Sequence, residues 1–100
     1  MSTLEGTLSA AVRSACQATY VPKILEGRQA VLALPGEWVV ANIERVVAAG
    51  LDLSDDWHYR RLLELYSLLD RALVHRLVEV GLSSEDPEIA EAPRDFSELT

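Results

Sequence analysis

The chain has a single cysteine, Cys16, and no long apolar run among its 100 residues. A lone cysteine forms no intrachain disulfide, which is typical of a protein in a reducing compartment. No apolar stretch approaches the ~20 residues that a membrane-spanning helix needs. The opening MSTLEG carries an acid and no basic group, so it does not resemble a secretory signal. We therefore expect a soluble, cytoplasmic protein without a membrane partner.

Basic residues are also scarce, because nine Lys and Arg face sixteen Asp and Glu, for a net charge of −7. This balance argues against direct binding to DNA or RNA, where Lys and Arg neutralise phosphates. Residues 1–50 hold four charges of each sign, whereas residues 51–100 hold five arginines and twelve carboxylates. An acidic field confined to one half favours a protein partner with a basic surface, although solvated acids alone would give the same composition.

Motifs that would carry catalysis or bind a cofactor are missing. The chain has no Gly-rich phosphate loop, no zinc-type cysteine spacing and no Ser–His–Asp order. Cys16 lies in an Ala-rich helical pattern with no base nearby, as a small buried residue would. His75 and Glu79 are spaced at i, i+4, but no third metal ligand is evident. We therefore expect no enzymatic activity, no metal and no cofactor.

Hydrophobic spacing predicts an all-α fold: one domain over residues 1–100, built as an irregular bundle of four to five short helices. Residues 7–20 form the first expected helix, and Pro22 either ends it or sets the turn that follows. Its apolar face is made of small residues, which would let another helix approach closely. The members of this face are Leu8, Ala11, Val12, Ala15 and Thr19.

Residues 20–34 allow two interpretations. The run 30–34 (AVLAL) is too short for periodicity to decide, and Glu26-Gly27-Arg28 could be the turn of a β-hairpin. Alanine is favoured in helices and depleted in strands, so we prefer a short helix here. The next helix should follow Pro35 and end at Gly50, with Trp38 as a largely buried anchor.

In the second half, Ser54 is the expected N-cap of a helix whose first turn contains Asp55 and Asp56. Apolar residues recur at helical spacing up to Val80, as one helix over 55–80 or as two helices that meet near Asp70, which we favour. The sequence 86–88 (DPE) then predicts a last helix. That helix should be short, because proline does not fit a helix interior and Pro93 follows soon. Phe96 is expected to fold back as an apolar anchor.

The segment 57–61 (WHYRR) is the densest cluster of large polar and aromatic groups. Trp, Tyr and Arg are enriched at interface hot spots. The alternative is that both aromatic residues anchor the helix in the core while the arginines pair with nearby acids. The candidate partner-binding residues are Asp52, Asp55, Asp56, Trp57, Tyr59 and Glu64.

The segments 55–65 (DDWHYRRLLEL) and 81–89 (GLSSEDPEI) resemble small acidic helical proteins of bacteria, some of which are immunity proteins that neutralise toxins. Residues 73–89 are also similar to one HEAT-type helical hairpin. The resemblance covers about half of the chain and implies a stoichiometric inhibitor that blocks a toxin domain through an acidic surface. The alternatives are a phage-type inhibitor of nucleic-acid machinery, with carboxylates in place of phosphates, and a helical adaptor.

Overall fold

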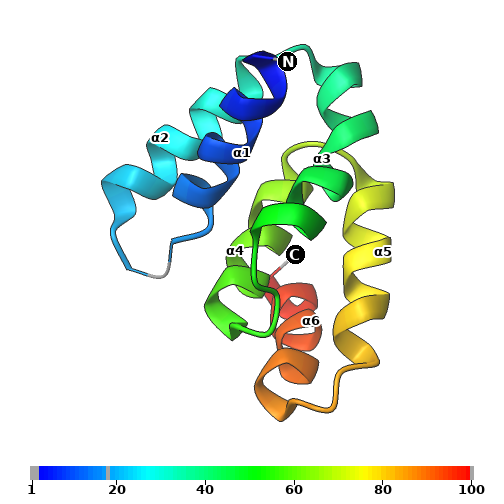
Figure 1. Ribbon diagram of the computed structural model, residues 1–100. Helices are drawn as coiled ribbons and strands as arrows, with labels where there is room; N and C mark the ends of the chain where they lie inside the picture. Colours follow the sequence, from blue (N-terminus) through cyan, green and yellow to red (C-terminus); the bar gives the residue numbers. More distant parts are fainter. Residues whose placement is uncertain (1–2, 18, 100) are drawn as a thin grey trace.

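The computed structural model describes residues 3–17 and 19–99, which form six α-helices and no strand (Figure 1). The all-α prediction is confirmed. The number of helices exceeds the predicted four to five. The six include the helix that we preferred within residues 20–34 and the two helices into which the leucine-rich segment divides. The helices are α1 (Thr3–Ala15), α2 (Val21–Leu32), α3 (Gly36–Gly50), α4 (Asp56–Ser67), α5 (Arg71–Leu82) and α6 (Pro87–Leu99).

Helices α1 and α2 pack closely as a helical hairpin. A Cβ atom at Gly27 would lie 2.6 Å from the carbonyl oxygen of Ala11 and 2.8 Å from Cα of Ala15. The close approach predicted for the small-residue face of α1 is therefore confirmed. Gly27 is therefore not part of a β-hairpin turn. Because it has no side chain, it allows the backbones of α1 and α2 to come into contact.

The limits of α1 differ from the predicted range 7–20. The helix begins at Thr3 and ends at Ala15, and Thr19 is exposed instead of joining the apolar face. Pro22 does not end α1 but lies in the first turn of α2, where its missing N–H group has no helical partner to lose. The apolar periodicity correctly predicted that a helix lies here, but it did not give the residues at which α1 begins and ends. At the C-terminal end this is because the apolar spacing continues into the connector that follows Ala15.

Helix α3 ends at Gly50 as predicted and contributes to the core that α1, α4 and α5 share. Trp38 is only partly buried, which corrects the expectation of a largely buried anchor. It lies in the first turn of α3 and packs against the edge of the core cluster. The fully buried positions of this helix are the apolar ones that follow: Val39, Ile43, Val46 and Val47.

Aspartates define the boundaries of α4 and α5. The side chain of Asp55 accepts hydrogen bonds from the N–H groups of Trp57 (2.9 Å) and His58 (3.3 Å), so Asp55 and not Ser54 is the N-cap of α4. The side chain of Asp70 accepts from the N–H of Ala72 (2.8 Å) and caps α5. The predicted break near Asp70 is therefore confirmed, and a single helix over 55–80 is excluded.

Helix α6 starts as predicted, with the side chain of Asp86 accepting from the N–H of Glu88 (2.9 Å). The expectation of a short helix is wrong, because α6 continues through Pro93. The proline lacks the N–H that would bond to Ile89, but its ring is buried beside α5. A Cβ atom at Gly81 would overlap the hydroxyl oxygen of Tyr59 and lie 2.9 Å from Cγ of Pro93, so both side chains use the space that the glycine leaves. Phe96 lies on the same helix and packs against the core.

Arginine–carboxylate pairs connect helices that are distant in sequence. Arg28 of α2 pairs with Glu64 of α4 (2.7 Å), and Arg60 of α4 pairs with Asp95 of α6 (2.9 Å). Helix α3 is joined to α5 by Arg76–Glu44 and to α1 by Arg45–Glu5. None of the helices in the described part of the chain has both the length and the apolar character needed to cross a bilayer.

Candidate protein-binding interface

Two of the predicted site residues, Asp52 and Asp55, are exposed but already bonded within their own turn. Asp55 caps α4, and the carboxylate of Asp52 accepts from both the N–H (3.0 Å) and the hydroxyl (2.5 Å) of Ser54. These hydrogen bonds from Ser54 hold the pKa of Asp52 below its ordinary value. Both aspartates therefore carry exposed negative charge, while their oxygens support the connector between α3 and α4.

Tyr59 is buried and is therefore not available to contact a partner. Its side chain is 0% exposed, and its hydroxyl donates to the carbonyl oxygen of Leu77 (2.6 Å). Burial also raises the pKa of Tyr59 to about 12. Tyr59 thus belongs to the core, which corrects the expectation that it could serve as an interface anchor.

Three other predicted residues, Asp56, Trp57 and Glu64, lie along one open groove between α4 and α6. We call it the α4–α6 groove; its volume is about 490 Å³. Trp57 remains 46% exposed and carries the guanidinium of Arg61 over its ring, 5.4 Å from the centroid. The residues that line the groove are Asp56, Trp57, Arg60, Arg61, Leu63, Glu64, Glu88, Glu91, Ala92, Asp95 and Phe96.

Carboxylates dominate the charge of this groove. Five acids and two arginines line it, a difference of three negative charges. Glu64 is bonded to Arg28 and Arg61, and Arg60 lies between Asp56 (3.8 Å) and Asp95 (2.9 Å).

Glu88 and Glu91 are exposed, and neither carboxylate forms an ion pair with a basic group in the described part of the chain. The excess negative charge of the groove therefore comes mainly from these two residues of α6.

The α6 carboxylates were absent from the candidate set. Glu88, Glu91 and Asp95 follow the spacing i, i+3, i+7, which puts them on one helical face once α6 continues past Pro93. That spacing is visible in the sequence. With a short last helix, Asp95 would not share a helical face with Glu88 and Glu91. The packing of α6 against α4 then brings these acids beside Trp57.

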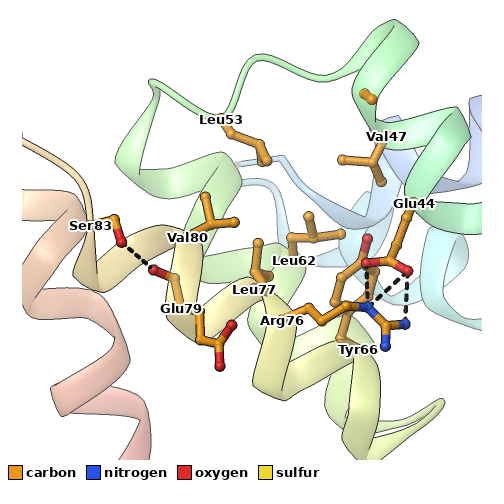
Figure 2. A pocket seen from close by; sticks show the side chains of 11 residues that line it. Glu44, Val47, Leu53, Leu62, Tyr66, Arg76, Leu77, Glu79, Val80 and Ser83 are labelled. Atoms are coloured by element: carbon orange, nitrogen blue, oxygen red, sulfur yellow. Dashed lines mark hydrogen bonds and ion pairs between the residues drawn. The ribbon is translucent and has the colours of Figure 1, made fainter.

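A second groove, the α3–α5 groove, lies between these two helices with α4 as its floor (Figure 2). Its volume is about 670 Å³. At one end Arg76 makes a two-pronged ion pair with Glu44, with Nε and Nη2 at 2.9 and 2.8 Å from the carboxylate oxygens. Apolar side chains cover most of the remaining wall: Val47, Leu53, Leu62, Leu77 and Val80 (Figure 2).

Cys16 lines neither groove. Cys16 is buried, and this burial raises the pKa of its thiol to about 12, so the thiol stays protonated at neutral pH. Within the residues that the structure describes, no three His, Cys, Asp or Glu side chains lie together in a metal-binding arrangement. The α4–α6 groove offers a half-exposed indole beside carboxylates, and the α3–α5 groove offers a largely apolar wall.

No family model, curated protein or solved structure matches this chain.

Proposed function

We propose that the chain is a non-enzymatic binding protein that holds a basic protein partner against the α4–α6 groove. The observation that carries the proposal is Trp57, which stays 46% exposed beside the two unpaired carboxylates of Glu88 and Glu91. A large aromatic side chain that the fold leaves in water is the usual anchor of an interface hot spot. The acids beside it select a partner that carries Lys or Arg around an apolar centre.

The charges of the groove act mainly before contact. A surface with excess carboxylates accelerates the approach of a basic partner over distances of about 8–10 Å, beyond which salt screens it. After contact, Trp57 and Phe96 supply apolar area and the α6 acids pair with basic side chains. We further propose that the partner is a bacterial toxin domain, which this chain neutralises by occluding a basic functional surface.

The experiment is a comparison of captured proteins. The purified chain and its Trp57→Ala variant serve as baits in a lysate of the source organism, and bound proteins are quantified by mass spectrometry at low and high salt. We expect one basic protein that binds the wild type, is reduced at least tenfold by Trp57→Ala and is released by salt. Co-expression with that protein should then restore the growth of cells that it otherwise kills.

Matched variants separate the groove from the rest of the surface. Tyr20→Ala removes another exposed aromatic side chain and should leave capture unchanged. The pair Glu88→Lys and Glu91→Lys should slow association, whereas Glu26→Lys with Glu37→Lys changes the net charge equally and should affect it less. The groove would not be the binding surface if Tyr20→Ala reduced capture as much as Trp57→Ala. The same conclusion would follow if the association rate did not change with salt or with the Glu88→Lys and Glu91→Lys reversal. A captured protein without toxicity would overturn the toxin part alone.

A further inference from the structure

The α3–α5 groove occupies a different side of α4 from the interface proposed above. Leu62 and Tyr66 line it, while Trp57 and Arg61 line the α4–α6 groove. At 3.6 residues per turn these two pairs lie roughly 140° apart around the helix axis. One molecule could therefore use both surfaces at the same time, and a function for the second does not depend on the first.

The two ends of the α3–α5 groove are unlike one another. The ion pair between Glu44 and Arg76 closes one end, and both α3 and α5 run away from it towards their C-termini (Figures 1 and 2). Leu53, just beyond α3, and Val80, near the end of α5, line the opposite end. Val80 is 57% exposed, so this open end presents apolar surface to water.

The open end also carries the charge of Glu79, which forms no ion pair with a basic side chain among the residues that the structure describes. Figure 2 shows the carboxylate of Glu79 directed away from its neighbours, and only its main-chain carbonyl accepts a hydrogen bond, from the Ser83 hydroxyl (3.0 Å). Arg76, the one basic residue that lines this groove, is engaged by Glu44 at the far end. The C-terminal ends of α3 and α5 each add the negative end of a helix dipole, of about half a charge.

We propose that the α3–α5 groove binds an amphipathic helix of a partner protein, with apolar side chains against Val47, Leu77 and Val80 and a Lys or Arg against Glu79. Helix α5 and its C-cap residue Ser83 line the groove from Arg76 onwards, a length of about 10 Å, which matches two turns of a docked helix. Such a helix presents anchors at i, i+4 and i+7 to an apolar groove. A second copy of this chain is a poorer occupant, because each copy carries a net charge of −7.

The test is a display library of short helical peptides, selected on the full-length chain. The peptides hold leucine at i, i+4 and i+7, and the flanking position is randomised. We expect Lys and Arg to be enriched at the flanking position. In ¹⁵N and methyl NMR spectra, a selected lysine peptide should shift the signals of Val47, Leu77 and Val80 and leave those of Trp57 and Ala92 in place.

Four variants decide whether the contact is specific. Val80→Ser should weaken the selected peptide about fivefold, because it removes apolar contact area. Leu82→Ser changes a similarly exposed residue of α5 outside the groove (53% against 57%) and should have no effect. Glu79→Lys should weaken binding at least about threefold, whereas Glu85→Lys, an equal charge change outside the groove, should change it less.

Several outcomes would overturn the proposal. They are the absence of any enriched peptide, enrichment of acidic peptides, shifts confined to the α4–α6 groove, and equal effects of Val80→Ser and Leu82→Ser. A small apolar amine, octylamine, that binds as tightly as the peptide would show instead a small-molecule site.

Discussion

At the scale of single residues, two glycines allow side chains or backbones to come together where a methyl group has no room. Gly27 permits contact between the backbones of α1 and α2, and Gly81 leaves space for Tyr59 and Pro93. Both glycines lie inside helices, where glycine alone is unfavourable. Their positions are explained by tertiary contacts and not by local conformation.

Gly27→Ala should therefore destabilise the fold although alanine is the better helix former. The added methyl would press on the backbone of α1, and we expect a loss of about 1–3 kcal/mol in the free energy of unfolding. Gly6→Ala is the matched control, because a Cβ atom there meets nothing within 4 Å. It should raise stability by about 0.5–1 kcal/mol. Urea denaturation measures both changes. If Gly27→Ala raised the free energy of unfolding, α1 and α2 would have to be farther apart than the structure places them.

At the scale of helices, the aspartate caps set where α4, α5 and α6 begin. Asp70→Ala removes the side-chain acceptor for the N–H of Ala72 and should lower the free energy of unfolding by about 0.5–2 kcal/mol. Asp70→Asn keeps an acceptor oxygen and should recover most of that loss. Thermal denaturation of the two variants compares them directly. Similar losses for Asn and Ala would show that the charge of Asp70, and not its cap, stabilises α5.

Glu64 combines an ion pair within its own helix, which helical spacing predicts, with an ion pair to another helix, which it does not. Its carboxylate lies between Arg28 of α2 and Arg61 of α4, at 2.7 and 3.0 Å. Glu64→Gln should cost about 1–2 kcal/mol, because two guanidinium groups would then share a half-exposed site with a neutral amide. Glu44→Gln removes the more exposed pair with Arg76 and should cost less, at most about 1 kcal/mol. Chemical denaturation that ranks these two variants in the opposite order would contradict this assignment.

The limits of sequence-based prediction follow the same division. Apolar periodicity and cap chemistry act within a few residues, so the helix at 20–34, the break at Asp70 and the start at Asp86 could be predicted. The continuation through Pro93 could not, because it depends on space provided by Gly81 of another helix.

The candidate site depends more on tertiary packing. Asp56, Trp57 and Glu64 could be selected from local sequence, and the structure places them along one groove, but the acids of α6 join them only through packing. Their role in binding stays a prediction. The burial of Tyr59 did have a local signal: it shares the helical face of Leu62, Leu63 and Tyr66 at i+3, i+4 and i+7.

At the scale of the whole molecule, the core contains weak acids that keep their protons when folded. Burial raises the pKa of Cys16 and of Tyr59 to about 12 and also raises that of Tyr66. The unfolded chain releases these protons at lower pH, near 9 for the thiol and 10 for the phenols. The folded state therefore binds more protons than the unfolded state in this range, and stability must fall as pH rises.

We expect the free energy of unfolding to decline from about pH 9 towards pH 12, by roughly 1.4 kcal/mol per pH unit for each such group. Cys16→Ala should delay the onset by about one pH unit, since the phenols then titrate first in the unfolded chain. Urea titrations at a series of alkaline pH values provide the measurement. A stability that stays constant to pH 11 would show that these groups are hydrated in the folded protein.

Because Trp57 is partly exposed, its indole fluorescence can report on the α4–α6 groove. The chain has two tryptophans; Trp38 packs against the core edge, and Trp57 stands under the guanidinium of Arg61 at the edge of the α4–α6 groove. With Trp38 replaced by phenylalanine, all indole emission would come from the groove. Any molecule that covers Trp57 or draws Arg61 away changes the polarity around that ring. Occupancy of the groove could thus be followed by fluorescence without an attached dye.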